Sequence, residues 1–266
     1  MVARLTQLPR PFIVAVITGR TSTAIAAAMQ RAAYAGAHAC ELNLPLVDVD
    51  QWAMMSSLVA SSPRPVYTSC RRAAFMDVYG RGPVSHWDEG ERMARQLELL
   101  DRGSVALDIE LDAFDDAQPV GVTDHPAAIT EQMRTVATAH ELGKEVVFSC
   151  HATQPLSRDE VIDSARIAQE RGGDLAKIVA PATDEEQALD YLAAATAINR
   201  NKMLPTTVIA AGKAGRFTRL LAPVLGRSWA LCQEHIEDGG FPDQPPIADA
   251  REALRILSAL HEYAPN

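Results

Sequence analysis

Eight short apolar runs alternate with longer amphipathic segments along the chain, and this alternation constrains the fold more than any other feature. Short runs rich in β-branched residues are typical of strands buried on both faces of a parallel sheet. We predict strands at residues 12–17, 37–42, 65–70, 105–109, 145–150, 175–179, 206–211 and 227–232. The predicted helices between them include residues 22–34, 87–100, 126–142, 158–171 and 184–199, with a last helix from about 247 to 261.

Eight strand-then-helix units in a row predict an α/β fold, a closed (β/α)8 TIM barrel, as one domain over residues 1–266. Glycines such as Gly36, Gly143 and Gly172 precede strands, where helices commonly end on a left-handed residue. The competing fold is a doubly wound open sheet, which normally carries a glycine-rich phosphate turn after its first strand. The chain has only Thr-Gly-Arg-Thr at residues 18–21, so the barrel is favoured.

The composition excludes several classes of protein. The chain has 266 residues, of which 47% are hydrophobic and 22% charged, and its formal net charge is -9. That charge argues against binding to nucleic acid or to anionic membranes, so local arginines must hold any anionic substrate. No apolar run approaches the roughly 20 residues of a membrane span, and no signal-peptide core follows the N-terminal charges. We therefore expect a cytoplasmic protein.

The four cysteines, Cys40, Cys70, Cys150 and Cys232, lack the close spacing of a zinc site or a redox motif. Three of them end or nearly end predicted strands. We expect reduced thiols in the core, and neither a metal nor a cofactor.

Lys177 is the most informative single residue, because it stands alone inside an apolar run that predicts a strand buried on both faces. A lysine is almost never fully buried without a reason. Burial would lower the pKa of its amine and leave the neutral form, which condenses with a ketone to give a Schiff base. The alternative is a lysine at a strand end whose amine reaches water. His151, which follows the preceding strand in the same way, favours chemistry.

Polar residues collect at the carboxyl ends of the predicted strands, where the active sites of barrels are assembled. In chain order these are Glu41, Asn43, Arg71, Arg72, Asp108, Glu110, His151 and Lys177, followed by the loop 212–219 and the segment 233–244. Scatter alone should populate the opposite strand ends as well, so we interpret the set as one candidate site. Asp108 and Glu110 would either lie behind it and orient His151 or Lys177, or cap the barrel rim.

These groups allow one particular chemistry. A neutral lysine forms an imine with a ketone, and the protonated imine acidifies the neighbouring C–H bond. His151 can take that proton and return one to a leaving hydroxyl, so a β-hydroxy ketone would lose water. Arg71 and Arg219 are candidates for binding a carboxylate, because a guanidinium makes two parallel hydrogen bonds to it. The partner is then a small anionic keto acid, and the reaction requires no metal.

Several segments resemble type I 3-dehydroquinate dehydratase over most of the chain. They are residues 36–43 (GAHACELN), 69–71 (SCR), 107–110 (LDIE), 148–151 (FSCH), 173–178 (GDLAKI), 212–219 (GKAGRFTR) and 240–244 (GFPDQ). The resemblance implies a TIM barrel that dehydrates 3-dehydroquinate to 3-dehydroshikimate in the shikimate pathway, commonly as a homodimer. It also implies that Lys177 forms the imine and that His151 is the general acid and base. The implied substrate-binding residues are Glu41, Asn43, Arg71, Arg219, whose guanidinium would bind the substrate carboxylate, and Gln244 of the lid.

Three positions depart from the pattern of that family. Asn43 stands where the family has an arginine, and Gly240 stands where its lid has a serine. Phe75 stands where the family has the glutamate that partners the catalytic histidine. Asp77, or Glu110 from the next strand, could serve as that partner instead.

These departures leave other functions open. One is imine chemistry on a related cyclic hydroxy-keto acid, and another is a barrel that binds such an acid without turnover. An imine-forming aldolase is the third. The lack of a glycine-rich phosphate cradle after the last two strands argues against a phosphorylated substrate for it.

Overall fold

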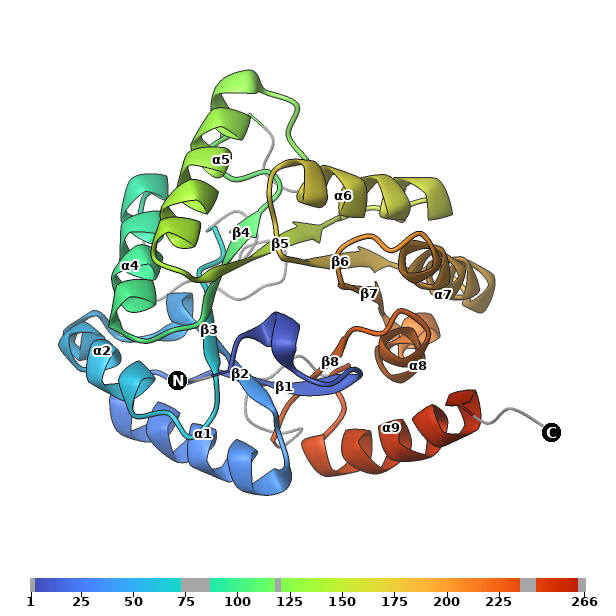
Figure 1. Cartoon of the computed structure of the whole chain (residues 1–266), viewed down its shortest axis with the longest axis horizontal. Coiled ribbons are helices and arrows are strands. Elements are labelled where there is room, and N and C mark those ends of the chain that lie inside the picture. Colours follow the sequence, from blue (N-terminus) through green and yellow to red (C-terminus); the bar gives the residue numbers. More distant parts are fainter. Residues whose placement is uncertain (1–2, 73–86, 118–120, 235–242, 263–266) are drawn as a thin grey trace.

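Eight parallel strands form one sheet that curls into a barrel, with helices around its outside (Figure 1). The computed structural model describes residues 3–72, 87–117, 121–234 and 243–262. The strands are β1 (Phe12–Ile17), β2 (Ala39–Asn43), β3 (Val66–Ser69), β4 (Ala106–Glu110), β5 (Glu145–His151), β6 (Leu175–Pro181), β7 (Thr206–Ala211) and β8 (Trp229–Cys232). They are hydrogen-bonded in the order β7-β6-β5-β4-β3-β2-β1-β8. The predicted TIM barrel is confirmed.

The barrel closes between β7 and β8, the two ends of that order. The Thr207 hydroxyl in β7 donates a hydrogen bond of 2.7 Å to the carbonyl oxygen of Trp229 in β8. Backbone ladders join the other neighbouring strands, and β1 pairs with both β2 and β8. A closed sheet brings the carboxyl ends of all its strands to one face.

Four of the predicted strands begin too early, those at 65 and 105 by one residue and those at 37 and 227 by two. The Ala37 N–H bonds to the Ala32 carbonyl oxygen at 2.9 Å as part of the end of the preceding helix, so β2 begins at Ala39. Arg227 has a φ of 47°, in the left-handed region that strands do not use, and β8 begins at Trp229. In both cases the chain completes a turn before it enters the sheet.

The helices surround the barrel and follow the strands in turn (Figure 1). Those described are α1 (Ser22–Ala35), α2 (Trp52–Ala60), α4 (Glu89–Arg102), α5 (Pro126–Glu141), α6 (Arg158–Glu170), α7 (Glu185–Arg200), α8 (Thr218–Leu225) and α9 (Ile247–Glu262). Several of them begin at a polar cap: the side chains of Thr21, Asp88, Ser157 and Asp184 each accept a hydrogen bond from the main-chain N–H three residues on. In the described parts of the chain, no helix is long and apolar enough to span a membrane.

Alternation along the strands divides the barrel interior into an apolar half and a charged half. Large apolar side chains fill the half near the amino ends of the strands, where Phe12 stacks on Trp229 with ring centroids 5.8 Å apart. The short helical turn η1 (Leu5–Gln7) covers this end, and Leu5 packs in the same cluster. Its main-chain N–H donates a 2.7 Å hydrogen bond to the Glu145 carboxylate. The charged side chains lie at the other end, near the carboxyl ends of the strands.

The cysteines are free and buried, as predicted for core thiols. Burial raises the pKa of the thiols of Cys40, Cys70, Cys150 and Cys232 to about 12. A thiol with such a pKa stays protonated near neutral pH and is a poor nucleophile.

The loop after β7 passes very close to its own strand. Gly212 has a φ of 97°, which favours glycine, and a Cβ built on Gly215 would overlap the carbonyl group of Ala210. The Thr218 hydroxyl donates to the Gly215 carbonyl oxygen at 2.7 Å and accepts from the Ala210 N–H at 3.1 Å. These contacts fix where α8 begins, and with it the position of Arg219.

We expect Gly215→Ala to lower the free energy of unfolding by about 2 kcal/mol, because the added methyl group has no room against a backbone carbonyl. Gly90→Ala is the matched control: it lies in the exposed first turn of α4, its added Cβ would be 3.4 Å from the Asp88 carboxylate, and it should be neutral or slightly stabilising. Urea denaturation followed by circular dichroism measures both variants. Equal stabilities would mean that the loop moves away from β7 at no cost.

Candidate active site

Lys177 lies inside the barrel in β6, away from water. Only 2% of the residue is exposed, so the alternative of an amine that reaches solvent at a strand end is wrong. Its Nζ lies 2.9 Å from Asp108 Oδ2 and 3.1 Å from Glu41 Oε1. Two carboxylates, from β4 and β2, therefore hold the amine across the interior of the barrel.

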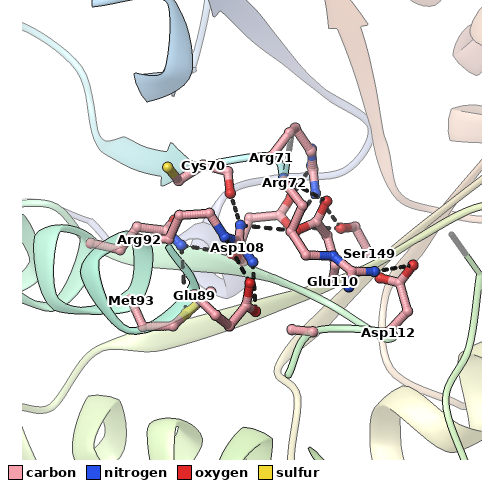
Figure 2. Close-up of polar contacts among 12 residues, drawn as sticks. Cys70, Arg71, Arg72, Glu89, Arg92, Met93, Asp108, Glu110, Asp112 and Ser149 are labelled. Atoms are coloured by element: carbon pink, nitrogen blue, oxygen red, sulfur yellow. Dashed lines mark hydrogen bonds and ion pairs between the residues drawn. The ribbon is translucent and has the colours of Figure 1, made fainter. Parts of the chain in front are cut away.

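Arg71 completes a group of four buried charges around that amine. Its guanidinium makes two parallel hydrogen bonds to Asp108, of 2.8 and 2.6 Å (Figure 2). It also lies 3.8 Å from Glu41. Ser149 in β5 donates to Asp108 Oδ1 at 2.6 Å and accepts from Arg71 at 2.5 Å. We call Lys177, Arg71, Glu41 and Asp108 the charge cluster. Its two cations and two carboxylates balance.

This balance governs the ionisation of its members. Burial alone would raise the pKa of Asp108, but Arg71 and Lys177, together with hydrogen bonds from Arg71 and Ser149, hold that pKa well below its usual value. Burial alone would lower the pKa of Arg71, and the carboxylates near it, Asp108 foremost, raise it instead. Both groups therefore stay charged near neutral pH.

Glu41 and Asn43 stand two residues apart on the inner face of β2. Glu41 Oε2 accepts a 2.5 Å hydrogen bond from the Tyr67 phenol in β3, while Oε1 faces Lys177. Asn43 is buried nearer the barrel mouth, and its Oδ1 has no hydrogen-bond partner among the described residues. A buried carbonyl oxygen normally has a partner, so this atom is open to a further hydrogen-bond donor.

His151 is the last residue of β5 and lies toward the mouth from Lys177. Ser149 pairs in register with Lys177, and His151 is two residues further along the same face of the strand. Desolvation by the surrounding protein lowers the pKa of the ring well below its usual value, and the Arg71 and Lys177 cations lower it further. The imidazole is therefore neutral near pH 7, the form that accepts a proton.

Glu110 belongs to a second group of charges, on the side of the sheet that faces α4 (Figure 2). It forms a 2.9 Å ion pair with Arg92 of α4. Arg92 also donates a hydrogen bond to the Cys70 carbonyl oxygen, and the Arg72 N–H lies 3.4 Å from a Glu110 oxygen. The main chain on both sides of Arg71 is therefore held by this pair.

Arg72 turns away from the charge cluster. Its guanidinium forms a 2.7 Å ion pair with Asp112 and donates to the Asp115 carbonyl oxygen at 3.0 Å. Burial, followed by the neighbouring Glu110 carboxylate, raises the pKa of Asp112, and the Arg72 cation opposes that shift. The pair ties the end of β3 to the segment after β4.

The structure thus separates the residues that the sequence predicted together. Four of them contact one another: Lys177, Glu41, Arg71 and Asp108. Asp108 contacts the Lys177 amine, as expected of a group that orients it, whereas Glu110 pairs with Arg92 and holds the segment that carries Arg71. No group of three or more His, Cys, Asp and Glu side chains in the described residues could hold a metal ion.

Arg219 and Gln244 lie at the side of the same barrel end where β7 and β8 meet. Arg219 is buried in the first turn of α8. Gln244 is buried beside Gln233, whose side-chain amide donates to the Gln244 carbonyl oxygen at 2.8 Å. Gln244 Oε1 has no hydrogen-bond partner among the residues that the structure describes. Three positions raised by the sequence lie outside those residues: Phe75, Asp77 and Gly240.

Tyr67 and Ser149 belong to the site although the sequence analysis did not single them out. Both stand inside apolar strand runs, where a phenol or a hydroxyl is easily read as core. The period of two along a strand is the signal that finds them. Tyr67 shares a face with Arg71, and Ser149 shares a face with His151.

Comparisons with known proteins identify the family of this barrel. A family model described as type I 3-dehydroquinase matches residues 13–261. A 3-dehydroquinate dehydratase of Alkaliphilus oremlandii (strain OhILAs) is 32% identical over 121 residues, which is 45% of this chain and 47% of that protein. The match therefore spans about half the length of that relative.

Solved structures share the fold over nearly the whole chain. The 3-dehydroquinate dehydratase from Geobacillus kaustophilus HTA426 has a TM-score of 0.80 at 18% identity, with 97% of each chain covered. The type I 3-dehydroquinate dehydratase from Clostridium difficile, solved with covalently modified comenic acid, has a TM-score of 0.78 at 16% identity, with 95% of this chain and 94% of that one covered. At such identities the likeness shows the fold alone.

We expect His151 to make the stability of the protein depend on pH. Its pKa in the folded state lies below the unfolded value of 6.5, so the stability it contributes is present above pH 6.5 and is lost as pH falls below it. Between pH 7 and pH 5 the wild type should lose up to about 2 kcal/mol more than His151→Gln. Denaturant unfolding at the two pH values measures this, with the exposed His125→Gln as the control. Parallel losses in wild type and His151→Gln would contradict the expectation.

Proposed function

Because the chain belongs to the type I 3-dehydroquinase family, a family of hydro-lyases, we propose that it dehydrates 3-dehydroquinate to 3-dehydroshikimate through an imine at Lys177. The observation that carries the proposal is the buried Lys177 amine in contact with two carboxylates, close to the neutral ring of His151. The place in the shikimate pathway, the homodimer and the cytoplasmic location remain predictions.

The reaction begins when the Lys177 amine attacks the ketone carbon of the substrate. The ammonium group first passes one proton to a base of the site, and the neutral amine adds to the ketone to give a carbinolamine. Return of that proton to the carbinolamine hydroxyl expels water and leaves a protonated imine. This imine draws electrons from the neighbouring carbon, and His151 removes a proton from that carbon. The enamine so formed expels the β-hydroxyl group, which takes a proton from His151 and leaves as water. Hydrolysis of the imine then releases the enone and restores the amine.

The charge cluster suits a reaction in which the lysine nitrogen is cationic both before the imine forms and after it has formed. A protonated imine replaces an ammonium ion at the same place, so Glu41 and Asp108 keep a positive partner. Arg71 holds Asp108 while the lysine changes its bonds. Loss of one charge from a buried group leaves an ionised partner unpaired, which is strongly destabilising. The surroundings therefore favour the charged imine, the form that activates the C–H bond.

Four further residues would bind the substrate. Both arms of the Arg71 guanidinium bond to Asp108, so Arg219 is the better candidate for the substrate carboxylate and Arg71 would contact a hydroxyl group. Asn43 would accept a hydrogen bond from another hydroxyl through its buried Oδ1. Gln244, buried beside Gln233 at the end of β8, would do the same.

A related cyclic hydroxy-keto acid is the second candidate substrate, and Asn43 is the observation that favours it. The family pattern has an arginine there, a cation that only donates hydrogen bonds. The Asn43 carboxamide is neutral, and its buried Oδ1 is an acceptor without a partner among the described residues. Such a site selects a ligand that offers a hydrogen-bond donor at this point. Binding without turnover is less well supported, because Lys177 and His151 both keep the surroundings that the chemistry needs.

Lys177→Ala should abolish covalent trapping of 3-dehydroquinate by borohydride, because no other group forms the imine. Lys202→Asn, at an exposed position with a φ of 54° that asparagine tolerates, should trap as the wild type does. Mass spectrometry of the reduced protein measures the adduct and its position. Trapping at another lysine in the Lys177→Ala variant would contradict the assignment.

The rise of enone absorbance on addition of 3-dehydroquinate tests the reaction itself. His151→Ala should lower kcat by at least about a hundredfold with a small change in KM, since proton transfer contributes about that much. Wild-type protein that traps the substrate but gives no enone would contradict the proposed dehydration. Wild-type protein that traps only other keto acids would point to the second candidate substrate.

Arg219→Lys should raise KM and lower kcat/KM by about tenfold to a hundredfold, because a two-point contact to the carboxylate becomes a one-point contact. Arg216→Lys is the matched control: Arg216 lies three residues earlier, its side chain is exposed, and it pairs with Asp243 at 2.8 Å. Steady-state kinetics with 3-dehydroquinate measures both variants. Equal effects at the two positions would argue that Arg219 does not bind the carboxylate.

A further inference from the structure

Tyr67 joins the apolar half of the barrel interior to the charge cluster. It is 1% exposed, and its ring packs in the cluster that contains Phe12, Val14 and Trp229. In the sheet it pairs in register with Glu41 of β2. Its ring is therefore part of the layer below the site, while its hydroxyl group reaches the carboxylate above.

The two oxygens of Glu41 have different partners. Oε1 lies 3.1 Å from the Lys177 Nζ, and Oε2 accepts a 2.5 Å hydrogen bond from the Tyr67 hydroxyl. Glu41 is itself 4% exposed, so water has little access to either oxygen. The contact fixes the rotation of the carboxylate, because the phenol binds one oxygen while Lys177, and Arg71 at 3.8 Å, face the other.

Tyr67 can act only as the donor in this pair. Burial, followed by the Glu41 carboxylate, raises the pKa of the phenol well above its ordinary value of 10. The phenol therefore keeps its proton throughout the pH range in which an enzyme of this kind works. A hydrogen bond donated to a carboxylate favours its ionised form.

We propose that Tyr67 is a positioning residue of the imine-forming site. Its hydroxyl group holds the Glu41 carboxylate ionised and turned toward Lys177. The proposal rests on the proposed function, because it assigns Tyr67 a part in the same reaction. Glu41 must stay a fixed anion while the lysine passes from ammonium to protonated imine. Tyr67 supplies this without touching the substrate, since its ring lies in the apolar layer below the amine.

Two consequences separate this role from simple packing. Without the phenol hydrogen bond, Glu41 would take up a proton at higher pH than in the wild type. The acid side of the pH–rate profile would then move to higher pH. The rate of imine formation would fall, whereas KM would hardly change.

The test compares Tyr67→Phe with Tyr191→Phe. Tyr191 is an equally buried phenol outside the barrel, where its hydroxyl donates to the Pro181 carbonyl oxygen at 2.9 Å and accepts from the Leu156 N–H at 2.8 Å. We expect Tyr67→Phe to lower kcat about tenfold and to move the acid limb of the profile up by about one pH unit. Tyr191→Phe should leave the shape of the pH profile unchanged. A loss of stability at Tyr67 with an unchanged profile would overturn the proposal.

A second variant keeps the test decisive if Tyr67→Phe folds poorly. Site-specific 3-fluorotyrosine at position 67 keeps the ring and its hydroxyl but makes the phenol more acidic, and hence a stronger donor. It should move the acid limb in the opposite direction, to lower pH. A limb that does not move, or that moves to higher pH, would contradict the role.

Carboxyl-carbon NMR of the substrate-free protein separates this proposal from the proposed function. Glu41→Gln identifies the Glu41 signal, and its titration is then compared between wild type and Tyr67→Phe. If wild-type protein neither traps nor dehydrates 3-dehydroquinate, the proposed function fails. A Glu41 signal that titrates at higher pH in Tyr67→Phe would still support the positioning of Glu41 by Tyr67. An unchanged titration would refute the positioning even if the wild type dehydrates the substrate.

Discussion

Four charges sharing the inside of an apolar barrel are the constraint on which the rest of this structure depends. Taking a single ion out of water costs several kcal/mol, which neither Lys177 nor Asp108 could sustain alone. The charges are tolerable because each is paired, at 2.6 to 2.9 Å for the shortest contacts of Asp108 with Arg71 and Lys177. The members come from β2, β4, β6 and the end of β3, so only the closed barrel assembles them. The same four residues are thus needed for the barrel to fold and for the proposed reaction.

The end of β3 shows how two adjacent arginines can serve different purposes. Side chains alternate along an extended chain, so Arg71 points into the barrel and Arg72 points out of it. Arg71 bonds to Asp108, and Arg72 pairs with Asp112 beyond the end of β4. Between them, Glu110 and Arg92 hold the main chain. The position of a guanidinium inside the barrel therefore depends on a buried ion pair outside it.

The sequence predicts the elements and their faces well, because both follow from local chemistry. A run of apolar residues with one lysine in it is unusual, and the period of two places Glu41, Arg71 and Lys177 on the inner face. The local sequence pattern does not show which residue each charged side chain will pair with. Arg71 was expected to bind a substrate carboxylate, yet its guanidinium bonds to Asp108 in the structure. That pairing depends on the stagger between β3 and β4, which only the folded sheet defines.

Asp108 and Glu110 illustrate the same limit. They lie two residues apart on β4 and share a face by periodicity, but Asp108 is inside the cluster and Glu110 is at the point where the strand ends. There the side chain can turn toward α4, and Arg92 provides a partner. The sequence pattern does not mark Tyr67 as a site residue, for a different reason. Its ring fits an apolar run, and its one polar atom matters only because Glu41 lies across the ladder.

The turn η1, which covers the amino end of the barrel, affects the route by which substrate, product and water reach the site. Leu5 packs with Phe12 and Trp229, and its N–H donates a hydrogen bond to Glu145, so this end of the barrel is covered. Among the described residues this covers the amino end, so a substrate would reach Lys177 from the carboxyl ends of the strands. In the proposed reaction, dehydration would release water there, and hydrolysis of the imine would need water to return by the same route. Product release and the entry of water would then use the same route, so the order in which they pass would set the order of the last steps.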